Sequence, residues 1–288
     1  MKRYVFPVFA ALLLLISTGC IETHLLVKVR PDGSGTLRET VKLNSDVLLP
    51  MMELAQAMNQ GEAEEGAEAP PPPPPPDIFS EDEIRSRAAS YGEGVRYLSH
   101  ERIDTEGKSG YSAEYAFSNI NALKLNSNPA AALPDMPGQV IEEGDDADDL
   151  VLFTFTKGSP SRLIIRPPAM DEKNEANTAE TPEPVPTQEE QSQPDEAASE
   201  EMKKIFSEMR VSIRVQIDGD IVGTNASYRD GSTITILDID FSKLMENEET
   251  IKQLEAMEDL TPAQMKELVS KIPGITFDSA DEIEIRFK

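Results

Sequence analysis

The sequence has few of the residues from which most active sites are built. Its 288 residues include one cysteine, two histidines and no tryptophan. A lone cysteine forms no intramolecular disulfide, and with only two histidines the usual histidine–cysteine zinc site is not expected. The sequence also has no P-loop, no G-x-G-x-x-G, no HExxH and no G-x-S-x-G. We therefore predict no catalytic residue, no cofactor and no metal site.

Positive charge is also scarce. The chain has 27 Lys and Arg against 53 Asp and Glu, a net charge of −26. The stretches 62–68, 142–149 and 171–201 carry about −20 of this total, so the rest of the chain is only mildly acidic. A nucleic-acid-binding protein needs a basic patch to contact phosphates, and the sequence contains none. Nucleic acid is therefore not an expected partner.

Three low-complexity segments interrupt the apolar patterning. They are rich in Pro, Ala and acidic residues, and too polar to form a core, so we expect them to be disordered. The first ends in seven consecutive prolines, Pro70 to Pro76. Such a run favours a stiff, extended spacer, and docking into an aromatic-lined groove is the alternative.

The N-terminus has the layout of a secretory signal peptide. Lys2 and Arg3 precede an apolar run from Tyr4 to Ile16, and small residues follow it. The run is about a dozen residues long, whereas a membrane-spanning helix needs roughly 20. We expect residues 1–19 to be removed.

The small residues that end in Gly19 and Cys20 resemble the lipobox of bacterial lipoproteins. The resemblance implies cleavage between Gly19 and Cys20, a diacylglycerol on the thiol, and acylation, for example with palmitate, of the new amine. One position departs from the family, because Ser17 stands where an aliphatic residue is usual. The alternative is a plain secreted protein that is cut nearby.

Lipidation at Cys20 would attach the exported chain stably to a membrane, since two acyl signals suffice for anchoring. In Gram-negative bacteria an Asp after the cysteine favours the inner membrane. This chain has Ile21 there, which favours the outer membrane, on its periplasmic or surface face. In other bacteria we expect the outer face of the cell membrane.

Alternating apolar residues predict about ten β-strands, mostly joined by tight turns. Three hairpins stand out, and the strand Val211–Ile217 has the cleanest alternation, followed by a turn into 221–228.

Ser80 begins a capping box for a helix in which Ile84, Ala88 and Tyr91 share one face. Further helices are expected at 46–59, 199–209, 242–257 and 261–272. The predicted fold class is therefore α+β, with antiparallel hairpins and a few packed amphipathic helices. One composite sheet and two lobes both remain open. The three hairpins pair Glu22–Arg30 with Thr36–Leu43, Val95–Asp104 with Tyr111–Ser118, and Leu150–Thr156 with Arg162–Arg166.

These signals divide the chain into eight segments. The signal peptide is followed by alternating folded and disordered parts, and the last part is a C-terminal α+β region. The predicted segments are 1–19 (signal peptide), 20–60 (lipidated cysteine, hairpin and helix), 61–77 (disordered), 78–125 (helix and hairpin), 126–149 (disordered), 150–167 (hairpin), 168–198 (disordered linker) and 199–288.

Two pairs of residues were considered for chemistry. His24 and His100 both fall on predicted strands, and we expect them on solvated strand faces rather than in catalysis. Asp238 and Asp240 lie two residues apart on one face of a strand, where a solvated position is the simplest interpretation. A weak calcium site or a carboxylate pair is the alternative.

A cysteine followed at once by a hairpin that contains DGSGT (Asp32–Thr36) resembles bacterial envelope lipoproteins of uncharacterised function, LppM-like ones included. The resemblance implies an α+β body at the envelope and no activity. The leading hypothesis is a membrane-anchored, non-enzymatic lipoprotein that binds a protein or lipid partner at the envelope surface. The alternative is a divergent envelope enzyme that uses Asp238 and Asp240.

Overall fold

The computed structural model describes residues 21–44, 79–105, 107–127, 150–168, 209–245, 264, 268–269 and 271–288. Gly19, Cys20 and the signal peptide lie outside these residues, as do the three low-complexity segments apart from their edges. Within the described ranges, no helix is both long and apolar enough to cross a membrane.

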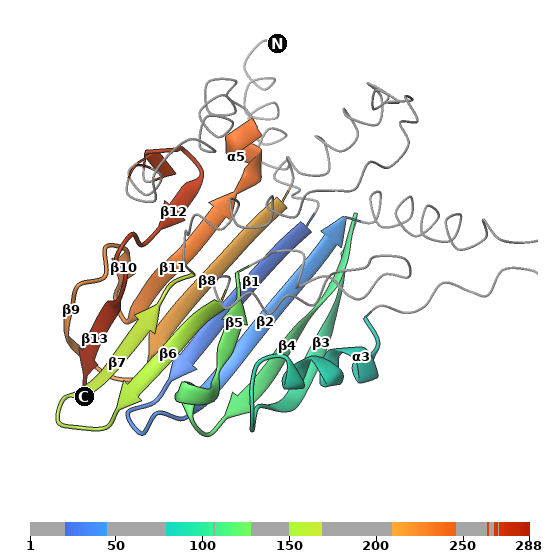
Figure 1. The fold of residues 1–288 in the computed structure, drawn as a ribbon. Helices are drawn as coiled ribbons and strands as arrows, with labels where there is room; N and C mark the ends of the chain where they lie inside the picture. Colours follow the sequence, from blue (N-terminus) through green and yellow to red (C-terminus); the bar gives the residue numbers. More distant parts are fainter. Residues whose placement is uncertain are drawn as a thin grey trace, which may run out of the picture.

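An eight-stranded sheet forms one layer of the protein (Figure 1). Its central strand, β1, pairs with β2 on one side and with β8 on the other, over all nine of its residues on both sides. The β1–β8 pair is parallel and the other pairs are antiparallel. The strands in spatial order are β10 (Arg229–Asp230), β11 (Thr233–Asp240), β8 (Met209–Ile217), β1 (Ile21–Val29), β2 (Gly35–Asn44), β4 (Lys108–Phe117) and β3 (Arg96–Thr105), with β12 (Ile275–Phe277) also paired to β11.

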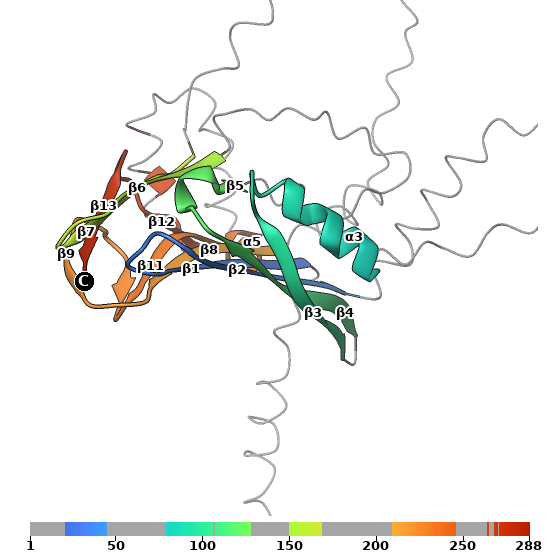
Figure 2. The same ribbon diagram turned by 90° about the horizontal axis from the view of Figure 1, so that it is seen from below.

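A second, five-stranded sheet packs against the first. Its strands in spatial order are β5 (Lys124–Asn126), β6 (Leu150–Thr156), β7 (Ser161–Arg166), β13 (Ile283–Phe287) and β9 (Ile221–Thr224). Viewed from below, this sheet and the helix α3 (Glu81–Ser86) lie over the same face of the large sheet (Figure 2). The two sheets share one apolar core, to which the large sheet contributes residues such as Val27, Leu37 and Ile213, and the second sheet Leu163 and Ile285.

The β1–β2 turn also contacts the second sheet. Gly33 has a φ of +83°, and a Cβ at this position would lie 2.5 Å from Cδ1 of the Phe155 ring. Only glycine combines that backbone conformation with so close an approach to an aromatic ring. The turn predicted from PDGSG is therefore also a packing contact between the two sheets.

Ser80 is confirmed as the N-cap of α3, which is one half of the predicted capping box. The Ser80 hydroxyl accepts a hydrogen bond from the Glu83 N–H at 3.3 Å, and α3 continues into the 3₁₀ turn η2 (Arg87–Ala89). Ile84, Ala88 and Tyr91 are buried, as their spacing predicted. The other described helical elements are the turn η3 (Ile120–Ala122), the five-residue α5 (Phe241–Met245) and short fragments at 264 and 268–269.

The helix α3 covers a buried charge. Glu39 projects from β2 into the core with no exposed surface, and Arg87 donates hydrogen bonds to its two carboxylate oxygens at 2.8 and 3.3 Å. The Tyr115 hydroxyl donates to Glu39 and to the Ile84 carbonyl. Burial raises the pKa of Tyr115 and Tyr111, and the Glu39 carboxylate adds to the effect. Glu39 and Arg87 thus join β2 to η2.

The predicted α+β fold class is wrong. The described residues are mostly β, arranged in two sheets, and α3 with η2 is the longest helical segment among them. The second sheet, rather than a set of amphipathic helices, covers most of the apolar face of the large sheet. The predicted helix 46–59 lies outside the described residues, as do nearly all of 199–209 and most of 242–257 and 261–272.

The three predicted hairpins are confirmed as β1–β2, β3–β4 and β6–β7. The expectation of purely antiparallel pairing is wrong, because β1 and β8 are parallel. The strand after the turn at 218–220 also does not pair back onto β8. It becomes β9 and pairs with β13 in the second sheet, so this turn carries the chain between the sheets. Both sheets draw strands from both halves of the chain, which excludes two separate lobes.

Candidate functional site

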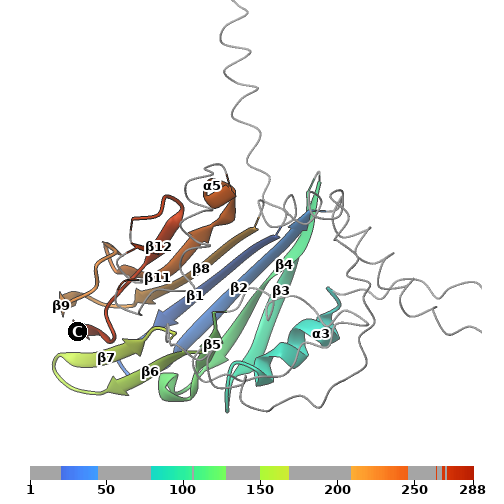
Figure 3. The same cartoon turned by 45° about the horizontal axis from the view of Figure 1, so that its top comes forward.

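The large sheet has a second face, which points away from the second sheet, and we call it the open face. Among the described residues no element packs over it (Figure 2), whereas Figure 3 shows the opposite face, with α3 and the second sheet in front of the large sheet. Strand register aligns its side chains in rows across β2, β1, β8 and β11. The central rows are Arg38–Leu26–Arg214–Thr235, Thr40–His24–Ser212–Asp238 and Lys42–Glu22–Arg210–Asp240.

The middle row contains a histidine–serine contact. His24 Nδ1 lies 2.7 Å from the Ser212 hydroxyl, and the Thr40 hydroxyl lies 3.0 Å from that of Ser112. His24 is on the predicted strand face, but it is half-buried rather than solvated, because Ser212 and its row neighbours enclose the ring. Burial lowers the pKa of His24, and the Glu22 carboxylate at 3.9 Å opposes this. Ser212 is only 2% exposed, so its hydroxyl is not open to a substrate and the pair does not indicate a hydrolytic serine.

The lowered pKa of His24 predicts a pH-dependent stability. The folded protein resists protonation of the ring, whereas the unfolded chain accepts a proton near pH 6.5, so stability should fall as the pH drops below about 6.5. Arg210 and Lys42 add to the effect, and Glu22 and Asp238 oppose it. We expect His24→Gln to lose less stability than the wild type between pH 7 and 5.5, measured by urea denaturation. Equal losses in the two proteins would contradict this assignment.

The third row and its neighbours are dominated by ion pairs. Glu22 accepts hydrogen bonds from Lys42 at 2.9 Å and from Lys108 at 2.6 Å. Burial opposes its ionisation, but these two lysines outweigh it and lower the pKa of Glu22. The cluster ties β1 to β2 and β4, which indicates a stabilising role rather than a reactive one.

Asp238 and Asp240 lie on the open face as predicted, but they have separate partners. Asp238 accepts hydrogen bonds from Arg210 at 3.1 and 3.2 Å and from Arg214 at 2.7 Å. Asp240 accepts one from the Ser242 hydroxyl and lies 3.5 Å from the Lys243 ammonium. Although burial opposes ionisation, these partners lower the pKa of both carboxyls. A carboxylate pair that shares a proton would instead show one strongly raised pKa.

Beside Asp238, the open face is hollowed into a groove of about 310 Å³, which we call the Arg38–Arg214 groove. Its volume is at the lower end of the range typical for small-ligand sites. Its wall contains no acidic side chain. The residues that line it are His24, Leu25, Leu26, Arg38, Thr40, Ser212, Arg214, Gln216 and Thr233.

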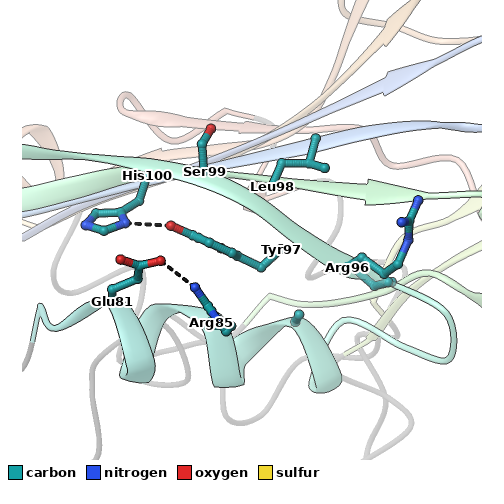
Figure 4. A pocket seen from close by; sticks show the side chains of 9 residues that line it. Glu81, Arg85, Arg96, Tyr97, Leu98, Ser99 and His100 are labelled. Carbon is teal, nitrogen blue, oxygen red and sulfur yellow. Dashed lines mark hydrogen bonds and ion pairs between the residues drawn. The ribbon is translucent and has the colours of Figure 1, made fainter.

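A larger and more open hollow of about 730 Å³ lies between α3 and β3 (Figure 4). Four of its polar side chains form two pairs. The Tyr97 hydroxyl lies 2.7 Å from His100 Nδ1, and Arg85 forms an ion pair with Glu81 and lies over the Tyr97 ring at 5.2 Å from its centre. His100 is thus half-buried and hydrogen-bonded, and these four side chains are satisfied within the protein.

The remaining predicted site residues are either outside the described ranges or structural. Gly19 and Cys20 are outside, so the lipidation site stays a prediction. Within the described ranges, no group of three or more His, Cys, Asp or Glu residues could hold a metal ion. Asp278 is buried and accepts hydrogen bonds from the Ser227 and Ala280 N–H groups, which is a structural role.

Sequence reasoning missed the two arginines of the groove. Arg38 and Arg214 each alternate with apolar residues on their strands, which marks them as outward-facing. Nothing in the sequence places these two strands on either side of β1, since residues 38 and 214 are far apart in the chain. The outward position was therefore predictable and the arginine pair was not.

Comparisons with known proteins add little to this description. No protein-family model matches the sequence, and a search of curated proteins found no match. Among solved structures, the chain matches the NMR structure of the folded domain of LppM from Mycobacterium tuberculosis. The match has 9% sequence identity and a TM-score of 0.30, and it covers 94% of this chain and 92% of that one. LppM is a lipoprotein, and a likeness this weak carries no argument about site or activity.

Proposed function

We propose that this chain is a bacterial envelope lipoprotein, anchored through Cys20, that binds a protein or lipid partner at the membrane surface and has no enzymatic activity. The observation that carries the proposal is the position of β1. This strand begins at Ile21, the residue after Cys20, and it is the central strand of the large sheet. An acylated Cys20 would therefore be joined to the protein body without a linker.

The consequence is geometric. One residue of extended chain spans at most about 3.6 Å, so the first row of the sheet would be held next to the headgroups. Ile21 pairs with Leu43 on β2 and with Met209 on β8, so the attachment point is fixed from both sides. Such an anchor suits a protein that presents its surface at a constant height and orientation above the bilayer.

The pairing of the charged groups supports a non-enzymatic role. A general acid needs a pKa near the working pH, and the partners of Asp238 and Asp240 lower theirs instead. Glu39, a buried carboxylate, is held by Arg87 and Tyr115 in the core, away from the open face.

A complementation experiment separates the two functional classes. We expect the variant Asp240→Asn to restore growth of a deletion strain under envelope stress, as the wild-type chain does, because among the described residues the Asp240 side chain is paired only with Ser242 and Lys243. Cys20→Ser should fail to do so. Asp240 is partly buried, so thermal unfolding of the purified Asp240→Asn variant must first show that it is folded. A folded Asp240→Asn variant that cannot complement would favour the carboxylate enzyme and contradict the proposal.

A further inference from the structure

The Arg38–Arg214 groove contains hydrogen-bond donors that the protein itself does not satisfy. The Nε–H of Arg214 is buried and has no acceptor among the described residues. The other side of this guanidinium is used, because Nη2 donates to Asp238 at 2.7 Å. A buried donor without a partner is unfavourable, and native proteins leave few of them. Because Nε is shielded from solvent, an acceptor in the groove could reach it only after a shift of the Arg214 side chain, whereas the exposed part of the guanidinium is open to a ligand.

The second arginine of the groove, Arg38, can also contact a ligand. Arg38 is 58% exposed, and its nearest acidic group among the described residues, Glu114, lies 3.9 Å away at the edge of ion-pair range. In the register of the sheet, Arg38 and Arg214 stand on either side of Leu26. Strands lie about 4.8 Å apart, so the two Cα atoms are separated by roughly 10 Å. Both arginine side chains are long enough to reach a group bound over Leu26.

The rest of the wall fits a small anion. The hydroxyl of Thr233 and the amide of Gln216 can donate hydrogen bonds, whereas the hydroxyls of Thr40 and Ser212 already contact Ser112 and His24. The wall of the groove contains two arginines and no carboxylate, and the acidic partners Glu114 and Asp238 lie beside it. Planar guanidinium groups and hydroxyls are the donors that recognise phosphate and similar oxyanions.

We propose that the Arg38–Arg214 groove is a binding site for an oxyanion, most simply the phosphate of a small phosphate ester or of a phospholipid headgroup. Arg38 and Arg214 supply the charge, and the Thr233 hydroxyl and the Gln216 amide supply hydrogen bonds. An oxyanion site would give the binding role proposed above a specific ligand. Its biological purpose rests on that proposed function, whereas oxyanion binding by the groove does not. The groove itself does not depend on lipidation of Cys20.

The test uses the mature chain with Cys20→Ser, labelled with ¹⁵N, and four probes. Inorganic phosphate and sulfate report on the bare oxyanion. Vesicles of phosphatidylglycerol report on a phosphodiester headgroup, and vesicles of phosphatidylcholine test whether a headgroup without net charge suffices. We expect the Arg214 Nε–Hε resonance to shift on saturation with an affinity of about 1 mM or tighter. Saturation by free phosphate points to a soluble ester, and saturation by the anionic vesicles alone points to a lipid.

Three variants locate the site. Calorimetry should show that Arg38→Gln and Arg214→Gln each weaken binding at least about tenfold, because each removes a charged donor. Arg210→Gln is the matched control. Arg210 also pairs with Asp238, and its side chain is 43% exposed against 42% for Arg214, but Arg210 does not line the groove. We expect it to bind within about twofold of the wild type, since loss of one rim charge changes affinity little. Arg38→Gln leaves the Asp238 network intact, so its result does not depend on the folding of the other variants.

The proposal is overturned if no probe gives a saturable shift, or if Arg210→Gln weakens binding as much as Arg214→Gln. The second result would mean a diffuse electrostatic attraction without a site. Neither result would bear on the attachment through Cys20, which is tested separately.

Discussion

Replacing Arg87 with methionine should destabilise the protein by about 3–5 kcal/mol, the range expected when one partner of a buried ion pair is removed. Glu39 has no exposed surface, and Arg87 is only 15% exposed and provides two of its hydrogen bonds. Without the guanidinium, the carboxylate would remain in the apolar core between β2 and α3. Urea denaturation of the mature Cys20→Ser chain, followed by circular dichroism, measures the loss.

The matched control is Arg85→Met, on the same helical segment. Arg85 is 58% exposed and pairs with the half-exposed Glu81, so its loss should cost no more than about 1 kcal/mol. The double variant Glu39→Leu/Arg87→Met should recover much of the lost stability, since it removes both charges and keeps the volume. Equal effects of Arg85→Met and Arg87→Met would show that the buried pair is not what holds α3 to the sheet.

Removing the thiol of Cys20 should release the protein from the membrane. A chain with Cys20→Ser, exported by a plain secretory signal peptide, should move from the membrane fraction to the soluble fraction, with at least a tenfold drop in the bound share. The reason is that each buried CH2 of an acyl chain contributes about 0.8 kcal/mol to attachment. Cell fractionation measures the share of the protein that is bound to the membrane. Metabolic labelling with an alkyne analogue of palmitate measures its acylation.

The control for that experiment is the same plain secretory signal fused to the chain with Cys20 retained. It should also be soluble and unlabelled, because the lipobox-type residues before Cys20 are missing from it. Membrane association of the Cys20→Ser chain would point to binding through the protein surface instead, and it would remove the reason to regard Cys20 as the anchor.

Much of the local structure was accessible from the sequence because it depends on neighbouring residues. The alternation in 22–30 and 36–43 predicts the β1–β2 hairpin, and Ser80 predicts the start of α3, since each signal acts over a few residues. The glycines of the PDGSG turn are equally local. Packing between the two sheets does not depend on neighbouring residues. This packing is the reason that the predicted α+β class was wrong.

The non-local pairing was beyond such reasoning. Leu25 of β1 pairs with Ile213 of β8, far along the chain, and no short-range pattern specifies a partner at that separation. The Arg38–Arg214 groove depends on this pair, so the groove could not be predicted either. One signal was readable: Glu39 interrupts the apolar positions Leu37 and Val41 on the core-facing side of its strand, which requires a buried cation opposite it.

The central claim is that the large sheet begins at a lipid-modified residue, and one measurement tests it most directly. Mass spectrometry of the N-terminal peptide of the protein purified from membranes should find Cys20 as the first residue, carrying a diacylglyceryl group on its thiol and an acyl chain on its amine. A mature N-terminus at another residue, with Cys20 absent or present as a free thiol, would contradict the account.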